Sequence, residues 1–420
     1  MPPTPCLLST SPLPCRRTAP SPPPRQWQVT PEQTELVYSQ GEGETPPAPG
    51  GKVHPVILLL AGVVKFNSTL KSLTLSSGLN NNGAESVATA VRENTTLEHL
   101  DVSGQHAIDA EGVQLLCESV RSHPKLQSVK IEGTTSLPIA QLRGTAGSEA
   151  VLNVAHLGLG VLSAHAMGTL LRGNLLLGSL NLDHNPFGAG GIKAIVEGLG
   201  EAPIKSLHLK GSGLAGTEDD VLKGLSESIC SNIGQLGELR MDENDLACEP
   251  EALAPMCKLR SLRTLSIEKN RLSRVPALIG TMLSLRHLLL YSNQLIDLPA
   301  CLCLITGLEV LDVHKNLITA LPQNIGKLTS LKKMVRRSPK SRLEVDPHAL
   351  PTTSPSPSLY LLSSHPFLLL VTPPLLRTSL RIRSPSSQSQ SASSPRRLAS
   401  RAAATPSRSP RSSRRDRGSA

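Results

Sequence analysis

Three histidines and two aspartates lie at positions of this sequence where metal binding or acid–base chemistry could be sought. They are His184, His287 and His314, with Asp183 beside the first and Asp312 near the last. A metal site needs several nitrogen, oxygen or sulfur ligands that converge on one point. The three histidines come in part from repeats that are not adjacent, so we expect no metal site and no bound cofactor.

Motifs of known catalytic or nucleotide-binding sites are missing from the sequence. No nucleophile elbow or zinc-ligand spacing appears. The run Gly188-Ala189-Gly190-Gly191 precedes an expected helix, as a phosphate-binding loop would, but no Lys-Ser or Lys-Thr follows it. We therefore interpret it as a turn between a strand and a helix, and we predict that the chain is not an enzyme.

The cysteines indicate a reducing compartment. The sequence holds eight, without C-x-x-C pairs or a paired disulfide framework. Disulfides persist mainly in secreted proteins, so we predict a cytoplasmic location, with the nucleus as the alternative. Cys301 and Cys303 could form a metal or redox pair, but we favour a role in filling small gaps in one repeat.

A leucine pattern with a fixed period organises the chain between residues 262 and 331. Leu262, Leu285, Leu308 and Leu331 are each 23 residues apart, and the first three open the pattern L-x-x-L-x-L-x-x-N. We expect the leucines at positions 1, 4 and 6 to point inward and stack on those of neighbouring repeats. This spacing leaves room only for a short turn between consecutive strands.

A longer version of the pattern precedes it. Leu70, Leu97 and Leu126 open strands 27 and 29 residues apart, and apolar residues at helical spacing lie between them. Asp109 is placed to cap one of these helices. Residues 134–150 break the pattern, and we expect a loop or an irregular repeat there.

These two patterns resemble two subtypes of leucine-rich repeat. The long repeats resemble those of ribonuclease inhibitor and NOD-like receptors, and the short ones resemble those of Ras-suppressor and Scribble-like proteins. The resemblance implies an α/β leucine-rich-repeat solenoid that is curved, with a parallel β-sheet on its concave face and helices and short turns on its convex face. Nothing in the chain matches the nucleotide-binding half of a NOD-like receptor, which leaves a regulator of such receptors as a third reading.

Composition divides the chain into three parts. We predict a disordered Pro/Ser-rich leader at 1–52 and a repeat domain at 53–334, with long repeats at 53–261 and short ones at 262–334. A disordered basic Ser/Pro/Arg-rich tail follows at 335–420. From Lys332 onward there are 17 Lys/Arg and 3 Asp/Glu, whereas the net charge of the whole chain is +10. The basic character therefore belongs to the tail, and nucleic acid is an expected partner only there.

No segment reads as a membrane span. Val56–Val64 is apolar but too short to cross a bilayer, and residues 351–376 are interrupted by six prolines. We expect no transmembrane helix.

Two sets of residues in the repeats have distinct expected roles. The asparagine at position 9 should bond backbone groups where the chain leaves the strand, a structural role that we assign to Asn185, Asn244, Asn270, Asn293 and Asn316. Side chains that point outward from the concave strands should contact a partner, with Leu289 and Tyr291 exposed among charged neighbours. The candidates are Glu238, Arg240, Asp242, Glu243, Glu268, Lys269, His287, Leu289, Tyr291, Asp312 and His314.

The function that follows is a non-enzymatic protein–protein interaction module or scaffold, which binds partner proteins on the concave face. By analogy with the short-repeat proteins, a role in signalling is implied. The alternative is an RNA-associated or nuclear protein that acts through the Arg/Ser-rich tail, where phosphate contacts would dominate binding.

Overall fold

The structure is a computed structural model that describes residues 33–39, 47–48, 50–145, 150–200 and 202–335, and the backbone of 369–370. Most of the predicted leader and tail lie outside the described residues. All described residues lie within residues 1–373. The division into leader, repeats and tail stays a prediction.

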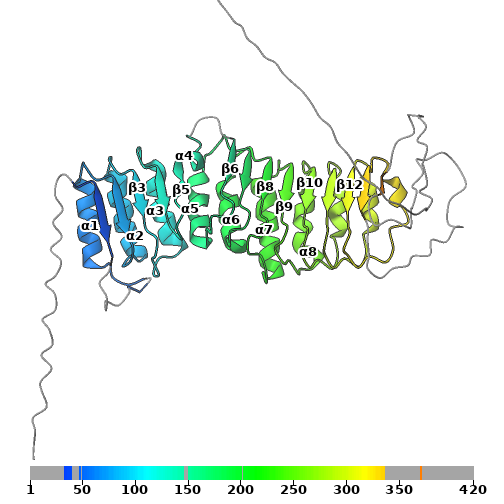
Figure 1. The fold of residues 1–420 in the computed structure, drawn as a ribbon, viewed down its shortest axis with the longest axis horizontal. Helices are drawn as coiled ribbons and strands as arrows, with labels where there is room; N and C mark the ends of the chain where they lie inside the picture. The colour runs from blue at the N-terminus through cyan, green and yellow to red at the C-terminus, as the bar shows by residue number, and fades with distance from the viewer. Residues whose placement is uncertain are drawn as a thin grey trace, which may run out of the picture. The chain divides into compact units, whose positions relative to one another are not determined.

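Short strands from successive coils build two sheets, which are parallel except where β5 and β14 pair. The first sheet runs in chain order from β1 to β5, and the second runs from β6 to β13 with β14 beside β13. In Figure 1 the strands of successive coils stand side by side, and the helices form a second layer. The strands are β1 (Glu35–Tyr38), β2 (Ser72–Leu75), β3 (His99–Asp101), β4 (Ser128–Lys130), β5 (Leu137–Pro138), β6 (Val151–Asn153), β7 (Ser179–Asn181), β8 (Ser206–His208), β9 (Glu238–Arg240), β10 (Thr264–Ser266), β11 (His287–Leu289), β12 (Val310–Asp312), β13 (Lys333–Val335) and β14 (Leu369–Leu370).

The helix layer changes character along the chain, as the two repeat lengths predict. The long repeats carry α-helices, whereas the 23-residue repeats carry only 3₁₀ turns, which need fewer residues to return the chain to the sheet. These elements are α1 (Pro55–Phe66), α2 (Asn81–Glu93), α3 (Ala110–Ser122), α4 (Ile139–Leu142), α5 (Val161–Leu171), α6 (Gly188–Gly198), α7 (Asp219–Asn232), α8 (Pro250–Leu253), η1 (Ala254–Lys258), η2 (Ala277–Thr281), η3 (Ala300–Leu304) and η4 (Ile325–Lys327). The predicted cap at Asp109 is confirmed, because its carboxylate accepts from the amides of Glu111 and Gly112.

The core is a stack of leucine layers. Leu262, Leu265, Leu285, Leu288, Leu308 and Leu311 are at most 4% exposed. In the three-residue strands the central residue points into this core, and the flanking residues point away from the helices. We call the sheet surface that turns away from the helices the open sheet face; it corresponds to the face predicted as concave.

The structure corrects the sequence analysis at β1 and adds an unforeseen strand at the other end of the repeats. β1 pairs in parallel with β2 although it lies inside the predicted leader. Its sequence, Glu35-Leu36-Val37-Tyr38, is too short to show a repeat. β14, which lies inside the predicted tail, pairs antiparallel with β13. Neither strand carries the leucine spacing on which the prediction relied.

The predicted break is where the first sheet ends. β5 turns back antiparallel to β4, and the second sheet begins at β6. The helix layer is continuous there, because α3 packs against α5. Among the described residues no helix is both long enough and apolar enough to cross a membrane.

In two loops that follow helices, a side chain at the helix end accepts hydrogen bonds from backbone amides of the loop; after α2 this side chain is an asparagine, and after α3 it is a histidine. After α2, the Asn94 side chain accepts the amides of Thr96 and Leu97 at 2.8 Å each. After α3, His123 Nδ1 accepts the amides of Lys125 and Leu126 in the same way, at 3.3 and 3.0 Å. His123 is buried, and its Nε2 has no hydrogen-bond partner among the described residues.

The core leads to a paired test on one strand. Leu288 is fully buried, whereas its neighbour Leu289 lies half-buried on the open sheet face. We expect Leu288→Ala to lower the free energy of unfolding by about 2–5 kcal/mol because it leaves a cavity, and Leu289→Ala to lower it by less. Chemical denaturation would measure both, and equal losses would contradict this assignment of inner and outer positions.

His123 leads to a test of pH dependence. Burial, and then the charges of Arg143 and Lys125, lower the pKa of His123 from its ordinary value. The folded protein therefore favours the neutral ring, whose Nδ1 must stay free to accept. The stability that this provides is complete above the unfolded pKa of about 6.5 and is lost as the pH falls below it.

We expect the asparagine of His123→Asn to accept the same two amide hydrogen bonds, as Asn94 does after α2. When the pH is lowered from neutral to mildly acidic, the free energy of unfolding of this variant should fall less than that of the native chain. Thermal unfolding at several pH values would measure this. The exposed His106→Asn is the control, and a pH profile of His123→Asn that parallels the native one would contradict the assignment.

Candidate interaction surface on the open sheet face

Four neighbouring strands place the predicted partner-binding residues. Strand pairing puts Glu238 beside Thr264, Thr264 beside His287, and His287 beside Val310. Because the register is the same at every step, side chains at one motif position form a row across the coils. The eleven candidates span about 75 residues of sequence. Parallel in-register pairing nevertheless brings them onto one surface, because neighbouring strands lie less than about 5 Å apart.

An asparagine ladder holds these coils together. In each repeat the asparagine Nδ2 donates to a carbonyl of the preceding coil at 2.7–3.0 Å, and its Oδ1 accepts an amide of that coil at 2.7–3.1 Å. Asn270 is an example, with Met241 as its acceptor and Leu246 as a donor. The members are Asn185, Asn244, Asn270, Asn293 and Asn316, all at most 6% exposed.

Parallel in-register strands, stacked leucines and this ladder together define the architecture. The fold is a leucine-rich-repeat solenoid. Its asparagines are occupied on both their donor and acceptor sides, and their amides are buried. They leave no free group for a ligand, so any partner must contact other side chains.

The residue before each ladder asparagine adopts a left-handed backbone, which sequence analysis missed. Its φ lies between +52° and +56° at His184, Glu243, Lys269, Ser292 and Lys315. Such values are uncommon outside glycine. The signal that could have revealed this turn is Gly211, which stands at the same place in its coil with φ +58°. Two of the candidates, Glu243 and Lys269, stand at this position, so the turn sets the direction of their side chains.

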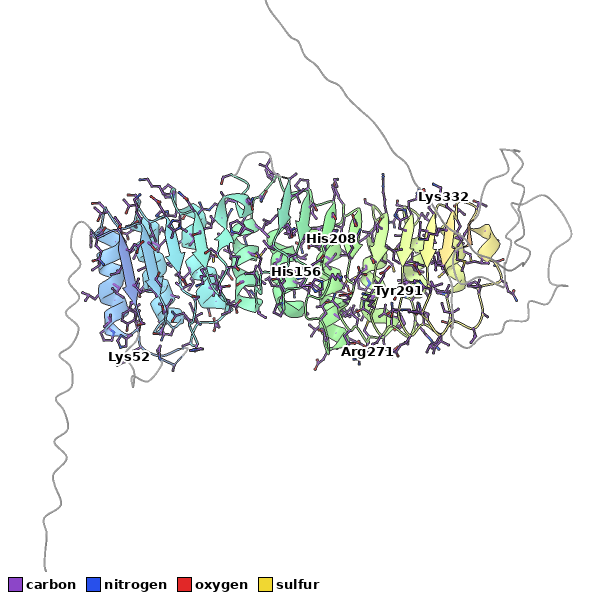
Figure 2. All side chains as sticks on the ribbon, in the orientation of Figure 1. Lys52, His156, His208, Arg271, Tyr291 and Lys332 are labelled. Atoms are coloured by element: carbon purple, nitrogen blue, oxygen red, sulfur yellow. The ribbon has the colours of Figure 1, made fainter. Side chains whose placement is uncertain are left out.

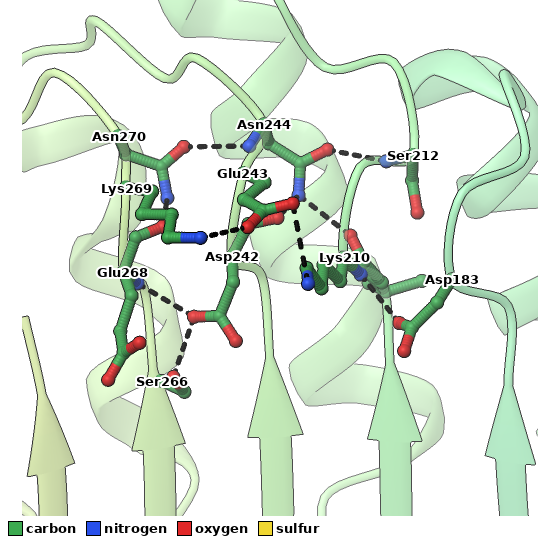
Figure 3. A network of polar contacts seen from close by, with 11 residues as sticks. Asp183, Lys210, Ser212, Asp242, Glu243, Asn244, Ser266, Glu268, Lys269 and Asn270 are labelled. Carbon is green, nitrogen blue, oxygen red and sulfur yellow. Dashed lines mark hydrogen bonds and ion pairs between the residues drawn. The ribbon is translucent and has the colours of Figure 1, made fainter.

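Carboxylates and bases are paired along one side of the surface (Figure 3). Glu243 bonds Lys269 at 2.5 Å and pairs with Lys210 at 3.4 Å. The hydrogen bond from Lys269, and then that from Lys210, lower the pKa of Glu243 from its ordinary value. These two lysines are therefore engaged with an acid of the chain itself.

A second pairing lies on β8 and β9. Glu238 bonds Arg240 at 2.7 Å and lies 3.5 Å from His208 Nε2. Burial tends to raise the pKa of Glu238, but the hydrogen bond and charge of Arg240 outweigh it, and the pKa is lowered. Arg240 thus has a partner within its own strand.

Tyr291 is not the exposed residue that we predicted. It is half-buried, its ring stacks on His314 with 4.1 Å between centroids, and its hydroxyl accepts from Lys315 at 2.8 Å. His314 in turn bonds Asp312 at 2.5 Å. Leu289 is half-buried as well. The prediction was wrong on exposure; for Tyr291 the reason is that His314 and Lys315 of the next coil cover part of the ring, whose place Figure 2 marks.

Glu268 differs from the other acids of the surface. Its carboxylate makes no hydrogen bond or ion pair with another described residue, whereas Asp242 accepts from Ser266 Oγ at 2.6 Å and from the Glu268 amide at 2.7 Å. Burial, and then the charges of Asp242 and Asp312, raise the pKa of Glu268. A half-buried acid between two others is a place where an incoming cation would be favoured.

The histidines considered for metal binding are engaged in separate contacts. His184 stacks on His156 at 4.3 Å, and His287 Nδ1 lies 3.2 Å from Thr264 Oγ1. Across the described residues, no group of three His, Cys, Asp or Glu side chains could hold a metal ion. Cys301 Sγ donates to the Ala277 carbonyl, and Cys303 is buried behind it in the same turn.

Comparison with known proteins adds little beyond the fold. No family model matches the chain, and no curated protein matches it. Among solved structures, a leucine-rich-repeat protein of Leptospira interrogans is similar at 19% identity and a TM-score of 0.37. The similarity covers 64% of this chain and 67% of that one. At this level it carries no information on partners.

The ladder leads to a test of its structural role. We expect Asn270→Ala to lower the free energy of unfolding by about 1–3 kcal/mol for each buried group left unbonded, because Met241 O and the Leu246 amide both lose their partner. Asn324→Ala, which changes an exposed asparagine of the same short-repeat block, is the control. Denaturant unfolding would measure both, and equal small effects would show that the ladder is dispensable.

Proposed function

We propose that this chain is a protein-binding module without catalytic activity, and that its partner contacts the open sheet face over β9 to β12. The observation that carries the proposal is Glu268, a half-buried carboxylate with no partner in the described chain, between Asp242 and Asp312. Water solvates such a group less well than an exposed one, so a basic group of a partner would gain from pairing with it.

The neighbouring side chains support a peptide or protein surface as the partner. Leu289 and Tyr291 offer apolar area next to Glu268. Side chains at the same motif position in successive coils form rows, so a partner could make one contact with each strand that it crosses. Aromatic and charged residues of this kind recur at binding hot spots. Three basic residues of the surface are already paired with acids of the chain, so an acidic partner would have to compete for them. They are Arg240, Lys210 and Lys269.

A finer assignment rests on the resemblance of the short repeats to Ras-suppressor and Scribble-like proteins. On that basis we propose a scaffold in signalling as the setting of this binding. The alternative of RNA binding through the tail concerns residues outside the described part of the chain, and no described contact favours it.

A charge reversal tests the proposed surface. We expect Glu268→Lys in the full chain to weaken capture of a native partner by roughly tenfold or more, equivalent to about 1.4 kcal/mol. The substitution breaks no side-chain bond among the described residues. The matched control is Glu227→Lys, the same charge change at an exposed position of α7 on the helix layer.

The measurement is quantitative affinity capture with three immobilised full-length proteins, read by mass spectrometry. Proteins retained by the native chain and by Glu227→Lys but lost with Glu268→Lys would be partners of the open sheet face. If every captured protein is retained equally by both variants, the assignment to this surface fails.

A further inference from the structure

Arg143 ends the short helix α4, at the break between the two sheets, and its guanidinium is only partly bonded. Nη1 donates to the His123 carbonyl, at the end of α3, at 2.9 Å. Nε and Nη2 are buried, and neither has a hydrogen-bond partner among the described residues. Buried donors are rarely left in this state, because each has lost its bonds to water and gained none from the protein. The fold therefore accounts for one nitrogen of Arg143 and leaves two without a partner.

The two unpartnered nitrogens share one edge of the guanidinium. The N–H groups on such an edge point in parallel, and this arrangement matches two oxygens of one carboxylate or phosphate group. Arg143 also has a structural role, because a positive charge is favoured at the C-terminus of a helix such as α3. Nη1 makes that contact, so the structural role gives the free edge nothing to bond.

A cavity of about 300 Å³ lies beside Arg143. It is bordered by the loop after α3 and by the end of α4, where the first sheet ends (Figure 1). This volume is far larger than the roughly 30 Å³ that one water molecule occupies in the liquid, so a small ligand fits. The polar residues that line the cavity are Glu98, Lys125, Gln127, Arg143 and Thr145.

Positive charge is in excess around this cavity. Lys125 is exposed and makes no ion pair with any residue that the structure describes, whereas Glu98 is paired with Lys71 at 3.0 Å. Burial lowers the pKa of Arg143, and no acid of the described chain is close enough to oppose this effect. The charges of Arg143 and Lys125 both contribute to the lowered pKa of His123, so both cations lie near the same ring. A negative charge in the cavity would be stabilised by both.

We propose that this cavity binds the phosphate group of a phosphate monoester, with two phosphate oxygens on Arg143 Nε and Nη2 and the remaining charge met by Lys125. The guanidinium edge turns toward the cavity to meet the ligand. A carboxylate would match the edge as well, but it carries one negative charge. A phosphate monoester carries about −1.5 to −2 at pH 7, which balances both cations.

This site is independent of the partner surface proposed above. The cavity residues belong to the coils before β6, whereas the proposed partner surface lies over β9 to β12. Loss of one site should leave the other intact, so the two proposals can fail separately.

Isothermal titration calorimetry of the full-length chain tests the site at constant ionic strength. The probes are inorganic phosphate, O-phosphoserine, glycerol 3-phosphate and acetate. We expect the three phosphates to bind at one site and acetate to bind more weakly. O-phosphoserine represents a phosphorylated side chain and glycerol 3-phosphate a free small molecule, so the tighter of the two identifies the source of the phosphate, and either order supports the site.

Three variants locate the binding. Arg143→Lys keeps the charge but removes the parallel donors, so phosphate affinity should fall roughly tenfold or more, as expected for loss of one charge-assisted hydrogen bond. Lys125→Gln should weaken phosphate binding by a smaller factor. Arg263→Gln, at an exposed arginine of the short repeats, is the control and should leave the affinity unchanged. Circular dichroism would check that each variant is folded, and if Arg143→Lys is not, the exposed Lys125 decides the test.

Three results would overturn the proposal. The first is a native chain that binds none of the phosphate probes, because water would then fill the cavity. The second is phosphate affinity that Arg143→Lys and Lys125→Gln leave unchanged. The third is acetate that binds as tightly as inorganic phosphate, because the site would then select a carboxylate.

Discussion

The cross-coil asparagine bond is the interaction on which the rest of this structure depends. Each coil must turn sharply away from its strand, and the turn leaves backbone carbonyls and amides inside the protein without partners. A buried asparagine side chain satisfies both kinds of group in the preceding coil. Asn270 does so for Met241 and Leu246. Because the bonds run between coils, they set the stacking distance and the register together.

That register creates the surface that we assign to partner binding. Short strands three residues long could not hold their side chains in rows without it. The rows allow acids and bases from different coils to pair, as Glu243 does with Lys210 and Lys269. They also place Glu268 near two acids, Asp242 and Asp312, while its carboxylate makes no hydrogen bond or ion pair with a described base. The candidate site is thus a consequence of the stacking, since none of these contacts exists within a single repeat.

A stack of this kind must also end, and its ends follow different rules from its middle. An inner coil is covered on both sides, so it uses small residues where helices meet and leucines between layers. β14 meets the last described parallel strand in antiparallel orientation, and β5 does the same where the first sheet stops.

The sequence alone determined the repeated part of the fold. Leucine spacing, helix periodicity and the Asp109 cap act within one repeat, so they predicted the parallel strands, the change from helices to short turns and the inward leucines. Only the tertiary structure decided the half-burial of Tyr291, the unpaired state of the Glu268 carboxylate, and strands β1 and β14. These depend on which side chains meet across coils, 23 to 32 residues apart or more, and no local pattern encodes such meetings.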